Sequence, residues 1–145
     1  MSASLHLAGP DALARLATMI DAAGSPLDFA QIEGALAPIL NGTPHGAAYL
    51  IGPARAPVGF VLVSFGWCVN AGGMTATIDQ IFIRENIRGR GMGSEVLIAL
   101  PKALAAAGVM TMRAHIPSDN TRAKSLFARL RFIETDAQTM QLALT

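Results

Sequence analysis

The sequence predicts a mixed α/β (α+β) fold, with one mixed, mostly antiparallel sheet of about seven strands flanked by four helices. Two observations support this. Apolar residues make up 52% of the chain and charged residues 14%, which indicates a well-filled core. The hydrophobic period also changes along the chain from helical spacing to strand-like alternation. A length of 145 residues suits one domain, which we expect to span residues 1–145.

The first third of the chain predicts a short strand followed by two helices. The strand is expected at Leu5–Ala8, and Pro10 and Asp11 suit the first turn of the helix after it. Asp28 and Gln31 have the spacing of a capping box, so a second helix should begin there.

The rest of the chain predicts six strands and two helices. A glycine-rich turn opens the first of these helices, in which Pro101 should cause a kink or a loosened turn. Asn120 should start the second helix. The expected strands are Ala47–Ile51, Val58–Phe65, Met74–Ile83, Val109–Ile116, Phe132–Asp136 and Met140–Leu144.

Composition argues against several classes of function. A net charge of +1 with scattered basic residues argues against a nucleic-acid binder. A single cysteine, Cys68, and three dispersed histidines argue against a metal site. The longest apolar run, Val58–Val69, is too short to span a bilayer, and Met1–Ser4 lacks the basic start of a secretory signal. We therefore expect a cytoplasmic protein without a metal, a nucleic-acid partner or a membrane partner.

The main candidate site follows the strand that ends at Ile83. Gly89, Gly91 and Gly93 alternate there, with Arg88 and Arg90 beside them. Alternate glycines expose backbone N–H groups and allow a positive φ. The helix that begins at this turn adds its unpaired N–H groups and the positive end of its dipole. The segment therefore predicts a phosphate or pyrophosphate site.

Two common phosphate motifs do not fit this segment. A P-loop requires a lysine after the glycines, and none follows here. A dinucleotide fingerprint counted from Gly89 would need glycine at the position of Ser94. The pattern that fits is Arg/Gln-x-x-Gly-x-Gly/Ala, with Arg88, Gly91 and Gly93.

This pattern at a strand-to-helix junction resembles the pyrophosphate loop of the GNAT superfamily of N-acetyltransferases. The segment from Asn120 to Phe132 is similar to the second signature of that family, Asn-x-x-Ala-x-x-Leu-Tyr-x-x-x-Gly-Phe. The order of elements also agrees. Locally, Ile78–Leu97 resembles the diamine acetyltransferases.

The resemblance implies an enzyme that transfers an acetyl group from acetyl-CoA directly to a primary amine of a small molecule. It places Asn120 beside the pantetheine arm and Asp79 as the base or the group that binds the amine. The strand backbone would also bind pantetheine, and the loop and first helical turn would bind the pyrophosphate. Those residues are Ile81, Phe82, Ile83, Arg88, Gly89, Arg90, Gly91, Met92, Gly93 and Ser94.

Two residues depart from the family pattern. Phe127 replaces the tyrosine that commonly protonates the leaving thiolate, and Tyr49 is the only tyrosine that could substitute for it. Arg131 stands where the pattern has glycine, so a positive φ there would carry strain.

Two alternatives stay open: acetylation of a protein or peptide amine, and a non-catalytic acyl-CoA-binding domain, which Phe127 favours. The family and the high apolar content are also compatible with a homodimer.

Overall fold

The structure is a computed structural model that describes residues 4–84 and 91–145. The chain forms two compact units, Met1–His115 and Ile116–Thr145, which are described separately. In the described residues, the first unit contains one sheet with helices on both faces, and the second contains one helix and an extended tail.

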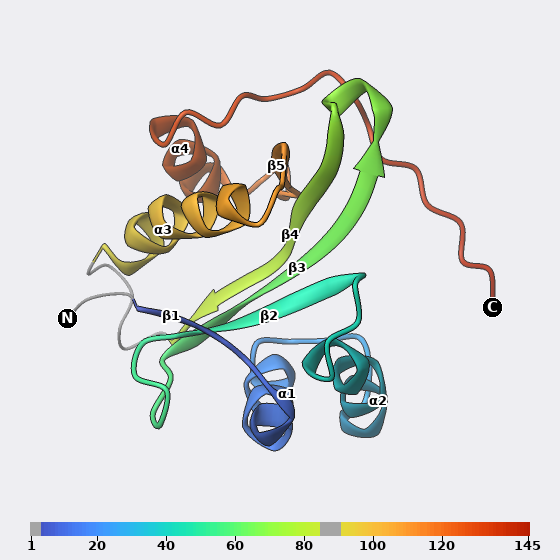
Figure 1. The fold of residues 1–145 in the computed structure, drawn as a ribbon, viewed down its shortest axis with the longest axis vertical. Coiled ribbons are helices and arrows are strands. Elements are labelled where there is room, and N and C mark those ends of the chain that lie inside the picture. The colour runs from blue at the N-terminus through green and yellow to red at the C-terminus, as the bar shows by residue number, and fades with distance from the viewer. Residues whose placement is uncertain (1–3, 85–90) are drawn as a thin grey trace. The chain divides into compact units, whose positions relative to one another are not determined.

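The sheet of the first unit has five strands in the order β1-β2-β3-β4-β5. Neighbouring strands from β1 to β4 are antiparallel, whereas β5 runs parallel to β4 (Figure 1). The expected mixed, mostly antiparallel sheet is therefore confirmed. The strands are β1 (Leu5–Leu7), β2 (Gly46–Ile51), β3 (Gly59–Cys68), β4 (Gly73–Ile83) and β5 (Thr111–Ala114).

Two helices, α1 (Leu13–Ala22) and α2 (Phe29–Leu40), cover one face of this sheet (Figure 1). A short 3-10 helix, η1 (Pro10–Ala12), precedes α1. The predicted capping box at the start of α2 is confirmed: the Asp28 carboxylate accepts a hydrogen bond from Gln31 N at 2.8 Å, and the Gln31 side chain accepts one from Asp28 N at 3.0 Å.

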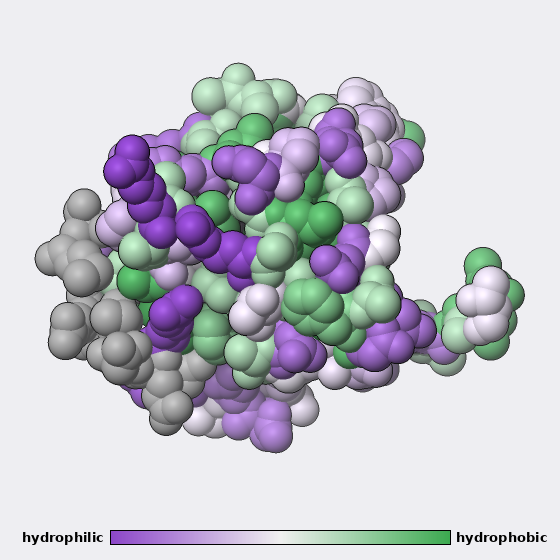
Figure 2. Space-filling view, turned by 90° about the horizontal axis from the view of Figure 1, so that it is seen from below, coloured by the Kyte–Doolittle hydropathy of each residue, from purple (hydrophilic) through white to green (hydrophobic). Residues whose placement is uncertain are grey.

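The core on this face joins the two helices to β2 and β3. Its buried side chains include Leu16, Ile20, Ile32, Leu36, Leu50 and Phe60, and Phe82 of β4 packs against them. Seen from the helix side, the surface outside this core mixes hydrophilic and hydrophobic residues (Figure 2).

Helix α3 (Met92–Ala106) lies on the opposite face of the sheet from α1 and α2 (Figure 1). It is continuous through Pro101, where a kink or loosened turn was expected. Its fully buried residues recur at helical spacing and supply the core on this face: Met92, Val96, Leu97, Leu100 and Leu104.

The second unit contains α4 (Thr121–Arg129), followed by an extended chain to residue 145. The predicted strands at Phe132–Asp136 and Met140–Leu144 are wrong, because neither segment pairs with a strand in the described part of the chain. An alternating sequence supplies only one half of a ladder, and without a partner its backbone has no inter-strand hydrogen bonds. The prediction of about seven strands fails for this reason.

In residues 4–84 and 91–145, no helix combines the length and apolar character needed to cross a membrane.

Candidate active site

A β-bulge in β4 marks the centre of the candidate site. Leu62 of β3 pairs with Gln80, but the next residue, Val63, pairs with Ile78. Asp79 is therefore an additional residue in β4 that has no partner in the ladder. Bulges of this kind re-aim a side chain and are common beside active sites.

Asp79 is held on the α1–α2 face of the sheet by Ser64. The Ser64 hydroxyl donates a hydrogen bond to Asp79 Oδ1 at 3.2 Å. Ser64 shares its face of β3 with Leu62 and Phe60, which pack on the α1–α2 side, because alternate strand residues point to the same face. The Asp79 side chain is exposed. An exposed carboxylate at this position can bind an incoming ammonium group or accept a proton from it.

The ladder between β4 and β5 ends immediately before the bulge. Its last pair is Ile78 with Ala114, whereas β4 continues to Ile83. The predicted pantetheine-binding residues Ile81, Phe82 and Ile83 lie in this continuation. There β4 pairs with β3 along one of its two edges. The structure thus places them in the segment of β4 beyond the end of β5. Their contact with pantetheine stays a prediction.

The start of α3 has the backbone geometry that the glycine pattern predicts. Gly91 is its N-cap and has φ +76°, in the left-handed region that favours glycine. A Cβ built on Gly91 would meet no atom within 4 Å, so the space beside its backbone is open in the described structure. Gly93 and Ser94 follow in the first turn and are half-buried, and Met92 is buried.

These features fit an anionic group at the α3 N-terminus. The first N–H groups of a helix have no partner within the helix, and they carry the positive end of its dipole. Glycine at the N-cap leaves the approach to them open. The side chain of Met92 is buried in the core, so the predicted contact of Met92 with the anion would have to come from its backbone. The predicted residues Arg88, Gly89 and Arg90 lie outside the described residues.

In the second unit, Asn120 caps α4. Its side-chain oxygen accepts a hydrogen bond from Ala123 N at 3.0 Å. The predicted contact of Asn120 with pantetheine stays a prediction. Phe127 is buried and makes an edge contact with Phe132, with ring centroids 4.8 Å apart. Arg131 has φ +72°, so the positive φ considered at the family's glycine position is confirmed.

Two further relationships were not apparent in the sequence. Arg113 of β5 acts on the Cys68 thiol at the end of β3. The pKa of Cys68 is lowered, first by a hydrogen bond from the Ala71 backbone and then by Arg113. Tyr49 pairs with Val61, on the opposite face of the sheet from Ser64, and burial raises its pKa. Tyr49 is therefore poorly placed to replace the missing tyrosine acid.

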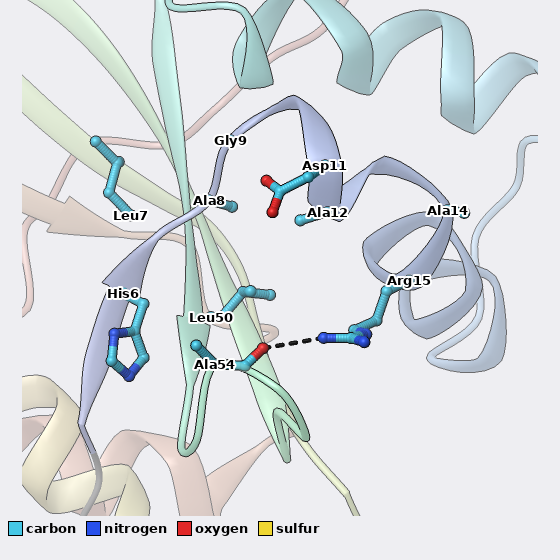
Figure 3. A pocket seen from close by; sticks show the side chains of 10 residues that line it. All are labelled: His6, Leu7, Ala8, Gly9, Asp11, Ala12, Ala14, Arg15, Leu50 and Ala54. Carbon is cyan, nitrogen blue, oxygen red and sulfur yellow. Dashed lines mark hydrogen bonds between the residues drawn. The ribbon is translucent and has the colours of Figure 1, made fainter.

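A cavity of about 380 Å³ lies elsewhere in the first unit (Figure 3). It is bounded by β1, η1, the start of α1 and the loop after β2. Asp11 and Arg15 project from η1 and α1 toward the strands, and Arg15 Nη1 donates to Ala54 O at 2.9 Å (Figure 3). None of the predicted site residues that the structure describes lines this cavity.

The described ranges contain no group of three or more His, Cys, Asp or Glu residues placed to hold a metal ion.

Solved structures share this fold over nearly all of the chain. A possible acetyltransferase from Clostridium difficile 630 has a TM-score of 0.84 at 15% identity, covering 100% of this chain and 99% of that one. AAC(6')-Iy, in complex with the bisubstrate analogue CoA-S-monomethyl-acetylneamine, has a TM-score of 0.84 at 16% identity and covers 100% of both chains. An integron cassette protein from the mobile metagenome of Cole Harbour Salt Marsh has a TM-score of 0.82 at 21% identity, covering 97% of this chain and 90% of that one.

At these identities the likeness concerns the fold, which is GNAT-like. No curated protein sequence matches the chain. The sequence profile of the family described as FR47-like protein matches residues 62–141. This range includes the bulge of β4, the start of α3 and α4, and it covers more than half of the 145 residues. The chain therefore belongs to the FR47-like protein family.

Proposed function

We propose that this protein is an N-acetyltransferase that uses acetyl-CoA and transfers the acetyl group directly to a primary amine of a small molecule. One observation carries the proposal: β4 extends past the end of β5, presents Asp79 on a bulge, and is followed by a helix whose N-cap is a left-handed glycine. An acidic group and an anion-binding helix start thus belong to consecutive elements of one unit.

The coenzyme supplies an acetyl group activated as a thioester. In our proposal the first turn of α3, with Gly91, binds its pyrophosphate through backbone N–H groups. The backbone of Ile81–Ile83 binds the pantetheine arm and stabilises the negative charge that develops on the carbonyl oxygen during transfer. The complex of AAC(6')-Iy with a CoA bisubstrate analogue supports this use of the fold.

Asp79 is the proposed base or amine-binding group. An alkylamine has a pKa near ~10.4 and arrives as an ammonium ion. The Asp79 carboxylate, oriented by Ser64, accepts its proton or binds the cation while the proton leaves to water. The buried Phe127 has no proton to donate, so this proposal assigns no acid to the leaving sulfur.

The proposed partner is a small-molecule amine, and the proposed location is the cytoplasm. The scattered basic residues support a small-molecule partner rather than a nucleic acid. The single cysteine, which cannot form an internal disulfide, supports a location in the cytoplasm. The local similarity to diamine acetyltransferases makes a small diamine one acceptor to test. Aminoglycosides are a second, because one protein with this fold is named an aminoglycoside acetyltransferase.

The test is isothermal titration with acetyl-CoA, using the wild type, Gly91→Val and the control Gly108→Val. Both glycines have positive φ, at +76° and +96°, and among the described residues no atom beyond the adjacent ones in the chain lies within 4 Å of a Cβ built on either. The two variants therefore carry a similar backbone strain, at the two ends of α3. We expect micromolar binding to be lost in Gly91→Val and kept in Gly108→Val.

Absence of binding by the wild type would contradict the proposal. If binding is found, a panel of amines and peptides should then be screened for acetylated product by mass spectrometry. Turnover of peptides alone would favour the peptide acetyltransferase alternative, and binding without any turnover would favour the non-catalytic domain.

A further inference from the structure

A row of paired residues crosses three strands of the sheet beside Asp79. Ser64 of β3 pairs with Thr77 of β4, and Thr77 pairs with Arg113 of β5. Residues that pair across neighbouring strands point to the same face of a sheet. Arg113 therefore lies on the α1–α2 face, as Ser64 and Asp79 do. An acidic and a basic side chain of neighbouring strands thus share one face.

The two charged groups point away from each other. Asp79 accepts its hydrogen bond from Ser64, whereas Arg113 acts on the Cys68 thiol at the end of β3. From Ser64 to Cys68 the strand rises about 13 Å, at roughly 3.3 Å per residue. Two strand spacings, about 10 Å, separate the backbones of Ser64 and Arg113. The carboxylate and the guanidinium are therefore held roughly 10 Å apart, too far for an ion pair.

The part of this face between the two charged groups carries only small side chains. Gly66 of β3 lies there, is exposed and has no side chain. Its partner in β4, Thr75, is 5% exposed, and its Oγ1 lies 3.2 Å from a Cβ built on Gly66. Asp79 and Arg113 themselves are exposed. Within the first unit, an extended chain therefore has room to run from one charge to the other.

We propose, on the basis of the proposed acetyl transfer, that the acceptor amine carries a carboxylate about 10 Å from its nitrogen and that Arg113 binds this carboxylate. The ammonium end approaches Asp79, and the chain between the two ends lies over Gly66. A guanidinium has five N–H donors, so its interaction with Cys68 leaves donors for a carboxylate. A second ammonium at the same place would be repelled. Amino acids of this length, rather than diamines, are the substrate class.

The transfer itself follows the proposed function. The amine nitrogen forms the amide bond with the acetyl carbon, and the carbon–sulfur bond breaks with its electron pair going to sulfur. The proton of the amine goes to Asp79 or to water. Arg113 takes no part in these steps and acts only by holding the far end of the acceptor.

Three linear acceptors of equal chain length test the proposal: ω-aminooctanoate, octylamine and α,ω-diaminooctane. They place a carboxylate, a methyl group or an ammonium at the far end. Release of coenzyme A gives kcat/KM for each. We expect the wild type to prefer ω-aminooctanoate over octylamine by about tenfold, the effect of one hydrogen bond to a charged group, and to use the diamine least.

Arg113→Gln should abolish this preference, because the amide has no charge to attract the carboxylate. Arg113→Lys keeps the charge without the planar fork and should keep part of the preference. The control Arg55→Gln, an exposed change in the loop after β2, should keep all of it. Melting curves show whether each variant is folded.

Calorimetry gives a second readout that does not depend on turnover. Without coenzyme, ω-aminooctanoate should bind the wild type about tenfold more tightly than Arg113→Gln. The proposal is overturned if Arg113→Gln matches the wild type in both measurements, or if the wild type prefers the diamine. Failure of the proposed function would appear separately, as absence of binding in the titration with acetyl-CoA, and calorimetry would then decide on the carboxylate site alone.

Discussion

The Ser64 hydroxyl donates a hydrogen bond to Asp79 Oδ1 at 3.2 Å, between two adjacent strands. Asp79 owes its position on this face to the bulge, and the hydrogen bond fixes one of its two oxygens. The other oxygen can bind or deprotonate an amine. The pair therefore supplies both a candidate catalytic group and the residue that positions it.

Replacing Asp79 by asparagine should lower kcat/KM for the amine by about 10²–10⁴-fold if the carboxylate is the base. Asparagine keeps the size and loses the charge and basicity. The affinity for acetyl-CoA, measured by titration, should stay the same. Asp21→Asn, an exposed change on α1, controls for the loss of one charge. Full activity of Asp79→Asn would remove Asp79 from the mechanism.

Replacing Ser64 by alanine should have a smaller effect, a loss in kcat/KM of about tenfold or less, the equivalent of one hydrogen bond. The Asp79 carboxylate remains but loses its orientation. The double variant should be no worse than Asp79→Asn alone, because Ser64 acts through Asp79. Additive losses would indicate a separate role for the Ser64 hydroxyl.

Tyr49→Phe should leave kcat within about twofold of the wild type, a change of roughly 0.4 kcal/mol in the barrier. Tyr49 lies on the opposite face of the sheet from Asp79, and burial raises its pKa. Steady-state kinetics with the preferred amine measure the effect. A loss of a hundredfold would show that Tyr49 is the acid after all.

Cys68 should react with iodoacetamide at lower pH than an unstructured cysteine does. Its lowered pKa, caused by the Ala71 backbone and by Arg113, makes the reactive thiolate available earlier as pH rises. Arg113→Gln should move the midpoint of the rate–pH profile upward, because the contribution of Arg113 to the lowered pKa of Cys68 is removed. Arg55→Gln, in the loop after β2, should not change it. An identical profile for all three proteins would contradict the contact.

Gly59→Ala should lower the free energy of unfolding by about 1–3 kcal/mol, the usual cost of overpacking. A Cβ on Gly59 would clash with the carbonyl oxygen of Phe82 on the neighbouring strand. Gly34→Ala is the matched control, since a Cβ at this exposed position of α2 meets nothing within 4 Å. It should stabilise the protein by about 0.5–1 kcal/mol. Urea denaturation measures both, and equal stabilities would contradict the close approach.

The helices could be predicted because their signals are local. Pro10 begins η1, and the capping box of Asp28 and Gln31 begins α2, as expected. The two C-terminal strands could not be predicted correctly, since residues 132–136 and 140–144 have strand-like sequences but need a partner. Whether an alternating segment forms a strand depends on what lies beside it.

In the candidate site, too, features set by the local sequence could be predicted, and features that depend on a neighbouring strand could not. The left-handed backbone at Gly91 follows from the glycine pattern, because few other residues adopt it without strain. The bulge at Asp79 depends on how β4 aligns with β3, which the sequence of β4 alone does not contain. Contact between Cys68 and Arg113 likewise requires β5 to lie parallel to β4, which brings together residues far apart in the chain.

The bulge has a consequence for deletion rather than substitution. Ile78 and Gln80 already face the partners that they would have in an unbroken ladder, Val63 and Leu62. Removing Asp79 altogether would therefore close β4 into a regular strand and leave every other side chain on its present face. The β3–β4 ladder does not require Asp79. Deleting its codon should therefore remove the acidic group of the candidate site while the fold of the sheet is kept.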